Sequence, residues 1–274
     1  MNPDSSINGN DRLVLYGYGV FETLRVSAGK LEVPKLHYRR MRAGAAVLGL
    51  DLPEYTEWLN HLKEIMKYEH PGESYALRFT LSGGDAYNGG SSQLLHHIRP
   101  IPYRDQDYQN GFKVCLLKHP RNEYSPCVGI KSANAIETLL GRQEASTQGA
   151  REGIWLNTKG DLTEGTVSNL FFVKAGVLCT PALDCGCLPG TRRTIILECA
   201  RSLGIPVTEG HFGVDELIQA DEVFLTNSLM GILPVNSIGD KRLPLSYQHP
   251  DSLTMGLRKS LHEYILKDEE TGQD

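Results

Sequence analysis

One lysine of the sequence lies where a lysine could do chemistry. Lys131 is preceded by the apolar or small residues 127–130 and followed by the small polar segment 132–134. A lysine removed from water has a lowered pKa and can act as a nucleophile or form a Schiff base. A single lysine more commonly extends to solvent along its apolar stem. The local sequence leaves both interpretations open.

A second segment predicts a place for an anion. Pro189 and Gly190 come directly before a helical pattern that begins at Thr191 and continues through Arg192 and Arg193. The first N–H groups of a helix have no partner within the helix, and the helix dipole adds positive potential there. Phosphate is therefore a natural ligand for this segment, and an ordinary helix start with surface arginines is the alternative.

The histidines and cysteines do not predict a metal site. His96 and His97 are adjacent in a strand-like run, so their side chains point to opposite faces of that strand. Cys179, Cys185 and Cys187 lie close together near a turn, but they form no Cys-x-x-Cys pair and no fourth ligand is obvious. We therefore expect free thiols here and no bound metal.

The elements that must position these residues alternate between amphipathic helices and short strands. Periodic apolar residues predict helices, and β-rich runs bounded by turn residues predict strands and hairpins. The expected helices are 36–50, 53–67, 133–146, 191–203 and 252–267. The expected single strands are 75–81, 94–101, 112–117, 221–225 and 232–235. Two hairpins are also expected, one formed by 154–157 and a strand from 162 onward, the other by 169–174 and 177–180. The glycine-rich residues 82–92 are expected to form a loop, and residues 103–110 are expected to form another.

The order of these elements predicts two mixed α/β domains. Residues 102–125 separate two regular patterns, and 118–129 contain two prolines without periodicity. We expect an N-terminal α/β domain over 1–110, a linker region over 111–124 and a C-terminal domain over 125–274.

Six segments match the motifs of one enzyme family in the family's order. They are 16–25 (YGYGVFETLR), 37–41 (HYRRM), 129–134 (GIKSAN), 162–171 (LTEGTVSNLF), 188–193 (LPGTRR) and 220–228 (ADEVFLTNS). The chain resembles the fold-type IV pyridoxal phosphate enzymes, which include branched-chain aminotransferases, D-amino-acid aminotransferases and aminodeoxychorismate lyases. The resemblance extends from residue 16 to about residue 243. It implies a smaller N-terminal α/β domain and a larger C-terminal pseudo-barrel domain that binds the cofactor.

The resemblance also implies a role for individual residues. Lys131 corresponds to the lysine that forms the Schiff base with pyridoxal 5′-phosphate and later moves protons. Glu164 corresponds to the carboxylate against the pyridine nitrogen, where it keeps the ring protonated and improves it as an electron sink. Arg40 corresponds to the arginine that binds the phosphate. The remaining cofactor-binding residues implied are Thr191, Arg192, Asn227 and Ser228.

One position departs from the family pattern. Tyr18 stands where the N-terminal motif, Y-G-D-G-V-F-E-T-L-R, has aspartate, so this position supplies no carboxylate. None of the implied cofactor-binding positions is affected by this change.

Within the family, two segments are most similar to aminodeoxychorismate lyases: 21–25 (FETLR) and 226–235 (TNSLMGILPV). That resemblance implies conversion of 4-amino-4-deoxychorismate to 4-aminobenzoate and pyruvate, a reaction of folate biosynthesis, with Thr23 as the proton donor. The candidates for binding the substrate carboxylates are Arg25, Arg78, Arg99 and Arg104. An aminotransferase of branched-chain or D-amino acids is the alternative function. A non-catalytic binder of small molecules is the alternative outside the enzyme class, and a complete set of site residues argues against it.

Composition excludes several other classes of protein. The chain has 274 residues, 40% of them hydrophobic, and a net charge of −5 from 28 basic and 33 acidic side chains. This composition is that of a folded, mildly acidic protein and does not favour binding to nucleic acid or to an anionic membrane. We find no apolar run that could span a membrane and no signal-peptide pattern. The six cysteines suit a reducing cytoplasm. The resemblance implies a homodimer.

Overall fold

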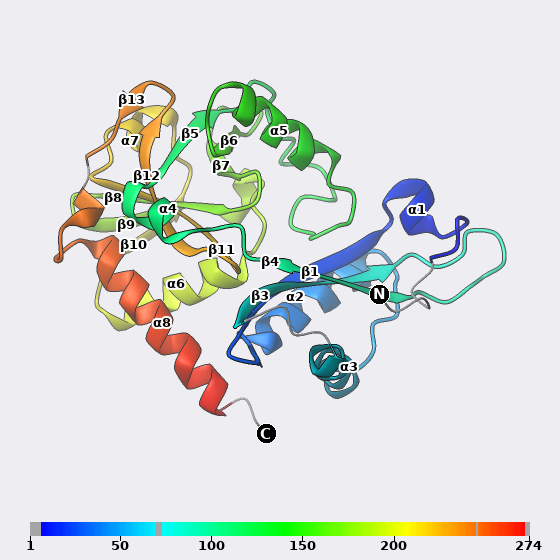
Figure 1. Ribbon diagram of the computed structural model, residues 1–274. Coiled ribbons are helices and arrows are strands. Elements are labelled where there is room, and N and C mark those ends of the chain that lie inside the picture. Colours follow the sequence, from blue (N-terminus) through cyan, green and yellow to red (C-terminus); the bar gives the residue numbers. More distant parts are fainter. Residues whose placement is uncertain (1–6, 69–72, 245, 272–274) are drawn as a thin grey trace. The chain divides into compact units, whose positions relative to one another are not determined.

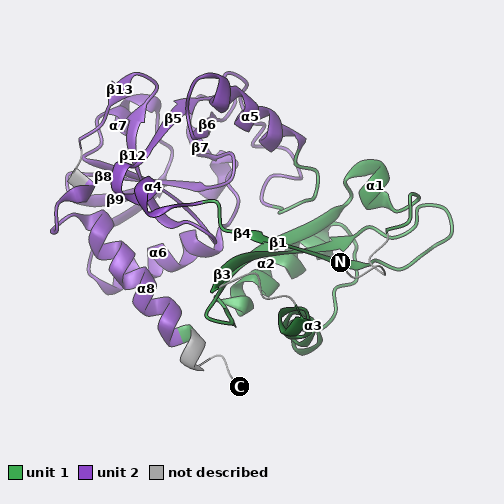
Figure 2. Ribbon diagram, in the orientation of Figure 1, with its two compact units in different colours: residues 1–102, 130–135, 268–274 green, residues 103–129, 136–267 purple. Residues whose placement is uncertain are grey.

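The computed structural model describes residues 7–68, 73–244 and 246–271, and these fall into two compact units (Figure 2). Unit 1 takes its described residues from 1–102, 130–135 and 268–274, and unit 2 comprises those of 103–129 and 136–267. This division differs from the expected domains. Residues 111–124 lie within unit 2, where 112–116 form a strand of its sheet. Residues 130–135 belong to unit 1.

Unit 1 is a four-stranded antiparallel sheet with helices on one face (Figure 1). The strands lie in the order β2 (Lys30–Leu31), β1 (Gly19–Ser27), β3 (Ser74–Ser82) and β4 (Leu94–Pro100). Helices α2 (Pro34–Val47) and α3 (Tyr55–Tyr68) cover this face, and the short helix α1 (Arg12–Tyr16) precedes β1 at the end of the sheet (Figure 1).

The two faces of strand β1 have different environments. Val20, Leu24 and Val26 are buried in one cluster with Trp58 of α3. The residues that alternate with them, Phe21, Thr23, Arg25 and Ser27, are half-buried. Successive side chains of a strand point to opposite faces. One face of β1 therefore packs against the helices, and the side chains on its other face remain partly accessible.

Unit 2 is built around a closed barrel. Strands β8 (Asn169–Lys174), β11 (Glu222–Asn227), β12 (Gly231–Ile238), β5 (Phe112–Leu116), β6 (Glu152–Leu156) and β7 (Leu162–Gly165) pair in that order, and β7 pairs back to β8. The apolar residues Ile154, Leu170, Val223 and Leu233 belong to its buried core. Closure removes the exposed sheet edges that a six-stranded open sheet would have.

The barrel carries two further strands and several helices. β9 (Val177–Pro181) pairs with β8, β10 (Val207–Gly210) pairs with β9, and β13 (Lys241–Arg242) pairs with β12. The helices are α4 (Asp105–Asn110), α5 (Ile136–Thr147), η1 (Leu183–Cys185), α6 (Thr191–Ser202), α7 (Val214–Ile218), η2 (Ser246–Gln248) and α8 (Leu253–Thr271). Helix α8 crosses α6 at an angle in the view of Figure 1. No helix among the described residues is long and apolar enough to cross a membrane.

The expected helices and strands are confirmed to within a few residues, and the mixed α/β fold class is confirmed. The helix expected from residue 133 begins at Ile136, because Ser132 bridges to Val20 and Ala133 donates its N–H to the Gly19 carbonyl (2.8 Å). The pattern gave no assignment for α1, β1, α4, β10 or α7. Residues 103–110, expected as a loop, contain α4.

Candidate active site

Lys131 lies on the open face of the unit 1 sheet. Its carbonyl accepts a hydrogen bond from the N–H of Phe21 (2.9 Å), so the segment runs beside β1. The Nζ atom lies 4.7 Å from the centre of the Phe21 ring. An ammonium over an aromatic face is attracted by the ring quadrupole. The half-buried lysine is thereby directed to the face of β1 that the helices leave uncovered.

Thr23 and three of the four candidate arginines, Arg25, Arg78 and Arg99, lie on this face by strand register. Thr23 and Phe21 are two residues apart on β1, and Thr23 pairs in register with Arg78 of β3. The guanidinium carbon of Arg78 lies 3.6 Å from the Phe21 ring centre. Burial lowers the pKa of Arg78, and the charge of Arg99 adds to this. A cation held here is suited to binding a carboxylate.

The other candidate arginines have different surroundings. Arg25 donates to Ser27 and forms an ion pair with Glu32 (3.4 Å). Arg99 is exposed on β4. Arg104 lies in unit 2, where it precedes α4 and donates its backbone N–H to Asp107 (2.9 Å). Among the four, Arg78 is therefore the one that shares the Phe21 ring with Lys131.

Arg40 is fixed by a buried carboxylate on the helix-covered side of unit 1. Its Nε donates to Oε1 of Glu22 (2.8 Å) and its Nη2 to Oε2 (2.6 Å). Nδ1 of His37 lies 2.6 Å from the same Oε2, and the side chains of Glu22 and His37 are fully buried. Burial alone would raise the pKa of Glu22, but the charges and hydrogen bonds of Arg40 and His37 outweigh it and lower the pKa to about 2. Glu22 is therefore a carboxylate that orients Arg40.

Tyr18, which stands where the family motif has aspartate, makes contacts that an aspartate could not make. The Tyr18 hydroxyl donates to the carbonyl of Leu48 at the end of α2 (2.7 Å), and the Arg12 guanidinium lies 5.1 Å from its ring centre. The tyrosine thus ties β1 to the helix layer instead of supplying a charge.

Glu164 lies at the end of β7 in unit 2 and is held by three partners. Arg121 forms an ion pair with its Oε1. Its Oε2 accepts from the side-chain amide of Asn169 (3.1 Å) and from the backbone N–H of Leu188 (3.0 Å). Glu164 is 6% exposed. Such a carboxylate is fixed in one orientation and can hold a proton on an adjacent ring nitrogen.

A second buried glutamate shapes the turn that follows Glu164. Glu152 accepts hydrogen bonds from the backbone N–H of Thr166 (3.0 Å), from the Thr166 hydroxyl and from the Ser168 hydroxyl (3.1 Å). Burial raises the pKa of Glu152 against these hydrogen bonds. A Cβ at Gly165 would lie 2.2 Å from the Ser168 oxygen, so the turn requires glycine. Glu152 therefore supports the backbone between Glu164 and Asn169.

The start of α6 forms a cradle for an anion. Gly190 precedes the helix, and a Cβ there would lie 1.9 Å from Oδ1 of Asn169, so the backbone passes directly over that side chain. Thr191 and Arg192 are buried, and Nη2 of Arg192 donates to the Ser228 carbonyl (3.3 Å). This contact brings the helix start beside the end of β11.

A buried hydroxyl lies on the same sheet face as Asn169, because Thr226 of β11 is its partner in register. Thr226 is fully buried, and its Oγ1 has no hydrogen-bond partner among the described residues. A buried polar atom without a partner is costly unless a ligand satisfies it. The helix start, the Arg192 cation and this hydroxyl together fit a phosphate group, and Glu164 in the same unit fits a protonated ring nitrogen. The residues of unit 2 are therefore suited to pyridoxal phosphate.

Asn227 shapes the β11–β12 turn with its side chain. Its Oδ1 accepts from the N–H groups of Leu229 and Met230 (both 2.9 Å), and its Nδ2 donates to the Tyr103 hydroxyl (3.0 Å) and the Val167 carbonyl (3.1 Å). These contacts place Ser228 in the turn.

Each unit thus gathers its own part of the predicted site. Unit 1 carries Lys131, Thr23, Arg25, Arg40, Arg78 and Arg99, and unit 2 carries Glu164, Thr191, Arg192, Asn227, Ser228 and Arg104. Sequence reasoning missed the two partners Glu22 and Arg121. Glu22 lies inside a quoted motif, which is a signal that could have found it. Arg121 is 43 residues from Glu164, and no spacing rule connects them.

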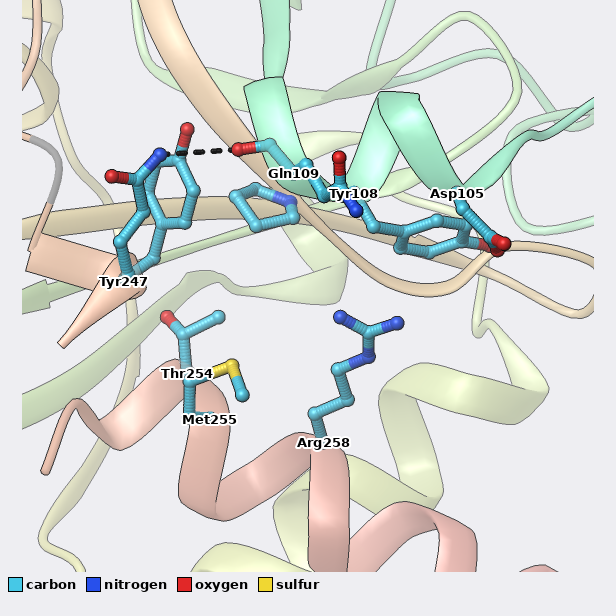
Figure 3. Close-up of a pocket in the computed structure, with 9 residues that line it drawn as sticks. Asp105, Tyr108, Gln109, Tyr247, Thr254, Met255 and Arg258 are labelled. Carbon is cyan, nitrogen blue, oxygen red and sulfur yellow. Dashed lines mark hydrogen bonds between the residues drawn. The ribbon is translucent and has the colours of Figure 1, made fainter. Parts of the chain in front are cut away.

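Unit 2 also has a hollow that none of these site residues lines, within the described part of the chain (Figure 3). The Arg258 guanidinium lies 4.6 Å from the ring centre of Tyr108, and the Gln248 amide donates to the Gln109 carbonyl (3.1 Å). Tyr108 in turn donates to the Met230 carbonyl (2.9 Å). The first of these contacts joins α8 to α4, and the other two join α4 to η2 and to the β11–β12 turn.

A barrel joined to an open sheet, with a fixed carboxylate and an anion cradle, is the arrangement of a fold-type IV enzyme. Residues 19–238 match the family model described as amino-transferase class IV, and the chain belongs to this family. It is a pyridoxal phosphate-dependent enzyme, as the sequence predicted.

Individual relatives differ in the reaction for which they are named. The chain is 29% identical over 246 residues to an aminodeoxychorismate lyase of Bacillus subtilis, with 86% of this chain and 82% of the relative covered. It is 28% identical over 283 residues to a D-alanine aminotransferase of Listeria monocytogenes, with 97% and 91% covered. The crystal structure of 4-amino-4-deoxychorismate lyase from Pseudomonas aeruginosa matches with a TM-score of 0.85 and 29% identity, over 95% of this chain and 96% of that one. Relatives named for the lyase reaction and relatives named for the aminotransferase reaction therefore show nearly the same sequence identity to this chain.

Proposed function

We propose that this enzyme is a lyase that converts 4-amino-4-deoxychorismate to 4-aminobenzoate and pyruvate. The observation that carries the proposal is the open face of β1, where Thr23 stands beside Arg78 in register and shares the face with Phe21 and Lys131. A hydroxyl, a cation and a lysine on one face supply a proton donor, a carboxylate partner and a base. The lyase relatives support the assignment.

The reaction requires one proton to leave and another to be delivered. When bound, pyridoxal phosphate supplies an electron sink that stabilises negative charge on the carbon bearing the substrate amine. Lys131, its attachment residue, removes the proton from that carbon. The carbon–oxygen bond to the enolpyruvyl group breaks, and Thr23 donates a proton to the departing group, which leaves as pyruvate. The remaining ring becomes aromatic, which drives the step forward.

The other residues bind and orient. Glu164, fixed by Arg121 and Asn169, holds the proton on the ring nitrogen of the cofactor. The N–H groups of Thr191 and Arg192, together with Ser228 and Arg40, bind the phosphate, and Asn227 shapes the turn that presents Ser228. Arg78 binds a substrate carboxylate, and Arg25, Arg99 and Arg104 are weaker candidates for the second one because of the contacts and exposure described above.

The test is a direct comparison of two reactions on the purified enzyme. With 4-amino-4-deoxychorismate we expect equal amounts of 4-aminobenzoate and pyruvate, measured by fluorescence and by coupling to lactate dehydrogenase. With L-glutamate, D-alanine or L-leucine and a keto acid we expect no amino-group transfer. Lys131→Ala abolishes the activity, and full turnover by this variant would contradict the role of Lys131.

A further variant separates Thr23 from its neighbours. Thr23→Val keeps the shape of the side chain and removes the hydroxyl, so we expect the lyase rate to fall by about 10²-fold, the low end for a positioned proton donor. Thr80→Val on β3 is the matched control for a hydroxyl of the same sheet. An unchanged rate in Thr23→Val would remove Thr23 from the mechanism.

The alternative is an aminotransferase of D- or branched-chain amino acids, which the extended match to the D-alanine aminotransferase favours. It would use the same Lys131 and Glu164. Loss of the visible absorption of the lysine-bound cofactor on adding one amino donor, with no 4-aminobenzoate formed, would establish this function instead, and the reactive donor would give the stereochemistry.

We also propose a homodimer, as the family resemblance implies. The apolar residues Ile136, Leu139 and Leu140 of α5 are about 60% exposed, at 64%, 62% and 59%, and such a patch is typical of an interaction surface. Light scattering that finds only a 30.4 kDa species would contradict the dimer.

A further inference from the structure

Three loops of unit 2 bring together Asp161, Cys185 and His211, none of which is assigned to the cofactor. Asp161 precedes β7, Cys185 ends η1, and His211 follows β10. One potential ligand atom from each residue lies within 4.8 Å of the others. Nδ1 of His211 is 3.0 Å from Oδ2 of Asp161 and 3.4 Å from Sγ of Cys185. Carboxylate, thiolate and imidazole are ligands that zinc prefers.

The three loops are held in place by backbone hydrogen bonds. Ala182 donates to the Gly210 carbonyl (2.9 Å), which joins the loop of Cys185 to that of His211. Leu162 donates to the Phe212 carbonyl (2.7 Å), which joins the loop of Asp161 to that of His211. The three side chains therefore meet because the backbone brings them together, before any ion is considered.

Asn157 fixes the orientation of Asp161. Its Oδ1 accepts from the Asp161 N–H (2.8 Å), and its Nδ2 donates to Oδ2 of Asp161 (3.1 Å). Ligating carboxylates are commonly held by such outer hydrogen bonds. The Asp161 oxygen that faces His211 is thus oriented in advance.

The distances fit tetrahedral coordination. Bond lengths of about 2.3 Å for sulfur and about 2.0 Å for nitrogen and oxygen place tetrahedral ligand atoms roughly 3.3–3.6 Å apart. The two separations from His211, 3.4 Å and 3.0 Å, need only small side-chain adjustments, and the oxygen of Asp161 and the sulfur of Cys185 lie within 4.8 Å of each other. The His211 side chain is 48% exposed, so a water molecule can reach the fourth position.

A second carboxylate stands behind the histidine. Nε2 of His211 lies 3.4 Å from Oδ1 of Asp184. Metal-binding histidines usually donate their other ring N–H to a carboxylate, which fixes the tautomer and raises the basicity of the ligating nitrogen. With Nδ1 facing Asp161 and Cys185, His211 has this arrangement.

We propose that Asp161, Cys185 and His211 bind a divalent transition-metal ion of the zinc type, with water as the fourth ligand. The thiolate and imidazole select such an ion over magnesium or calcium, which prefer oxygen ligands. The ion joins three loops of unit 2 and has no part in the reaction proposed above. The expectation of free thiols at 179, 185 and 187 is thereby revised for Cys185 alone, since Cys187 donates to the Thr163 carbonyl (3.3 Å).

The first test uses Co²⁺ as a spectroscopic probe on the purified holoenzyme. We expect one ion per chain, a thiolate-to-cobalt charge-transfer band and the visible bands of a tetrahedral site. His211→Asn weakens binding by at least 100-fold, and Asp184→Asn weakens it by about tenfold, the range for an outer partner. Cys127→Ser, at an exposed cysteine of the same unit, is the matched control and binds normally. Absence of the charge-transfer band, or its persistence in Cys185→Ser, overturns the proposal.

A second test covers the case in which Cys185→Ser, at a buried position, fails to fold. Stoichiometric Zn²⁺ raises the unfolding midpoint of the wild type and of Cys127→Ser, because an ion that binds only the folded state stabilises it. His211 is half-exposed, so His211→Asn is expected to fold, and Zn²⁺ does not raise its midpoint. An equal rise in His211→Asn, or an equal effect of Mg²⁺ on the wild type, overturns the proposal.

Discussion

Each unit contains a carboxylate paired with an arginine, and the two pairs differ in which partner is fixed. Glu22 in unit 1 is fully buried and faces Arg40 and His37. Glu164 in unit 2 keeps 6% exposure and is held by Arg121, Asn169 and the Leu188 N–H. The Glu22 carboxylate is fully buried between Arg40 and His37. The Glu164 carboxylate keeps a small exposed area and is bound by one arginine and by two neutral N–H donors.

The difference indicates opposite tasks for the same pair of residue types. A sealed carboxylate cannot contact a ligand, so Glu22 acts through Arg40, whose guanidinium it orients. A carboxylate held by several donors at a residual opening keeps its orientation and can still receive a ligand, so Arg121 acts through Glu164. The same ion pair therefore positions a cation in one unit and an anion in the other.

The largest expected effect is on stability in unit 1. Glu22→Gln leaves Arg40 and His37 without their counter-charge, and breaking a buried ion pair costs about 3–5 kcal/mol of unfolding free energy. Urea unfolding measures the change, with Glu57→Gln on the exposed surface of α3 as a control expected to show none. A loss in Glu22→Gln no larger than in the control would contradict the sealed-pair interpretation.

The same pair predicts an acid dependence of stability. The pKa of Glu22 is lowered to about 2 in the folded protein from 4.5, so its stabilising effect is present above pH 4.5 and is lost as the pH falls toward 2. The loss is about 3 kcal/mol for a shift of this size. Unfolding measured at several acidic pH values should show the wild type approaching Glu22→Gln. Parallel pH curves for the two proteins would contradict this.

In unit 2 the expected effect is on activity. Glu164→Gln removes a charged hydrogen bond to the ring nitrogen under the proposed function. Such a bond contributes about 1.5–3 kcal/mol, which corresponds to a fall in kcat of roughly 10- to 10²-fold. Unfolding free energy should change less than in Glu22→Gln. Steady-state kinetics and urea unfolding together test this, with Glu198→Gln on α6 as the control. A stability loss equal to that of Glu22→Gln would remove the contrast between the units.

The smallest expected effect concerns the arginine that orients Glu164. Arg121→Met leaves Glu164 with the amide of Asn169 and the N–H of Leu188, so the carboxylate stays in place with one charged partner fewer. We expect kcat to fall by about tenfold, the effect of one hydrogen bond to a charged group at the low end of its range. The visible absorption of the bound cofactor should shift in its pH dependence, which a purely structural role would not change. Arg142→Met on α5 is the control, and equal effects in the two variants would contradict the role of Arg121.

Local patterns predicted most elements of both units because periodicity and turn residues act over short stretches. Helix α6 begins at Thr191 after Pro189 and Gly190, as the pattern predicted, and the hairpin of β8 and β9 turns at Ala175 and Gly176. The family motifs likewise predicted Lys131 and Glu164 as site residues, and their roles stay predictions. These are features in which the relevant residues are neighbours in the chain.

Pairings between distant segments were not predictable in this way. The closure of the barrel by β7 and β8, the return of residues 130–135 to unit 1 and the contact of Arg121 with Glu164 each join segments through the fold. The cysteines show the limit most clearly. Cys179, Cys185 and Cys187 are neighbours in sequence, yet only Cys185 meets Asp161 and His211.

The sequence by itself determined the family and the cofactor, because these depend on chemistry carried by short motifs, and the residues that serve the cofactor stay predictions from the same motifs. Only the tertiary structure decided which charges meet: Glu22 with Arg40, Arg121 with Glu164, and Cys185 with His211. The physical reason is that burial and ion pairing depend on distances in space, and the hydrogen bonds that set those distances connect strands and loops far apart in the chain.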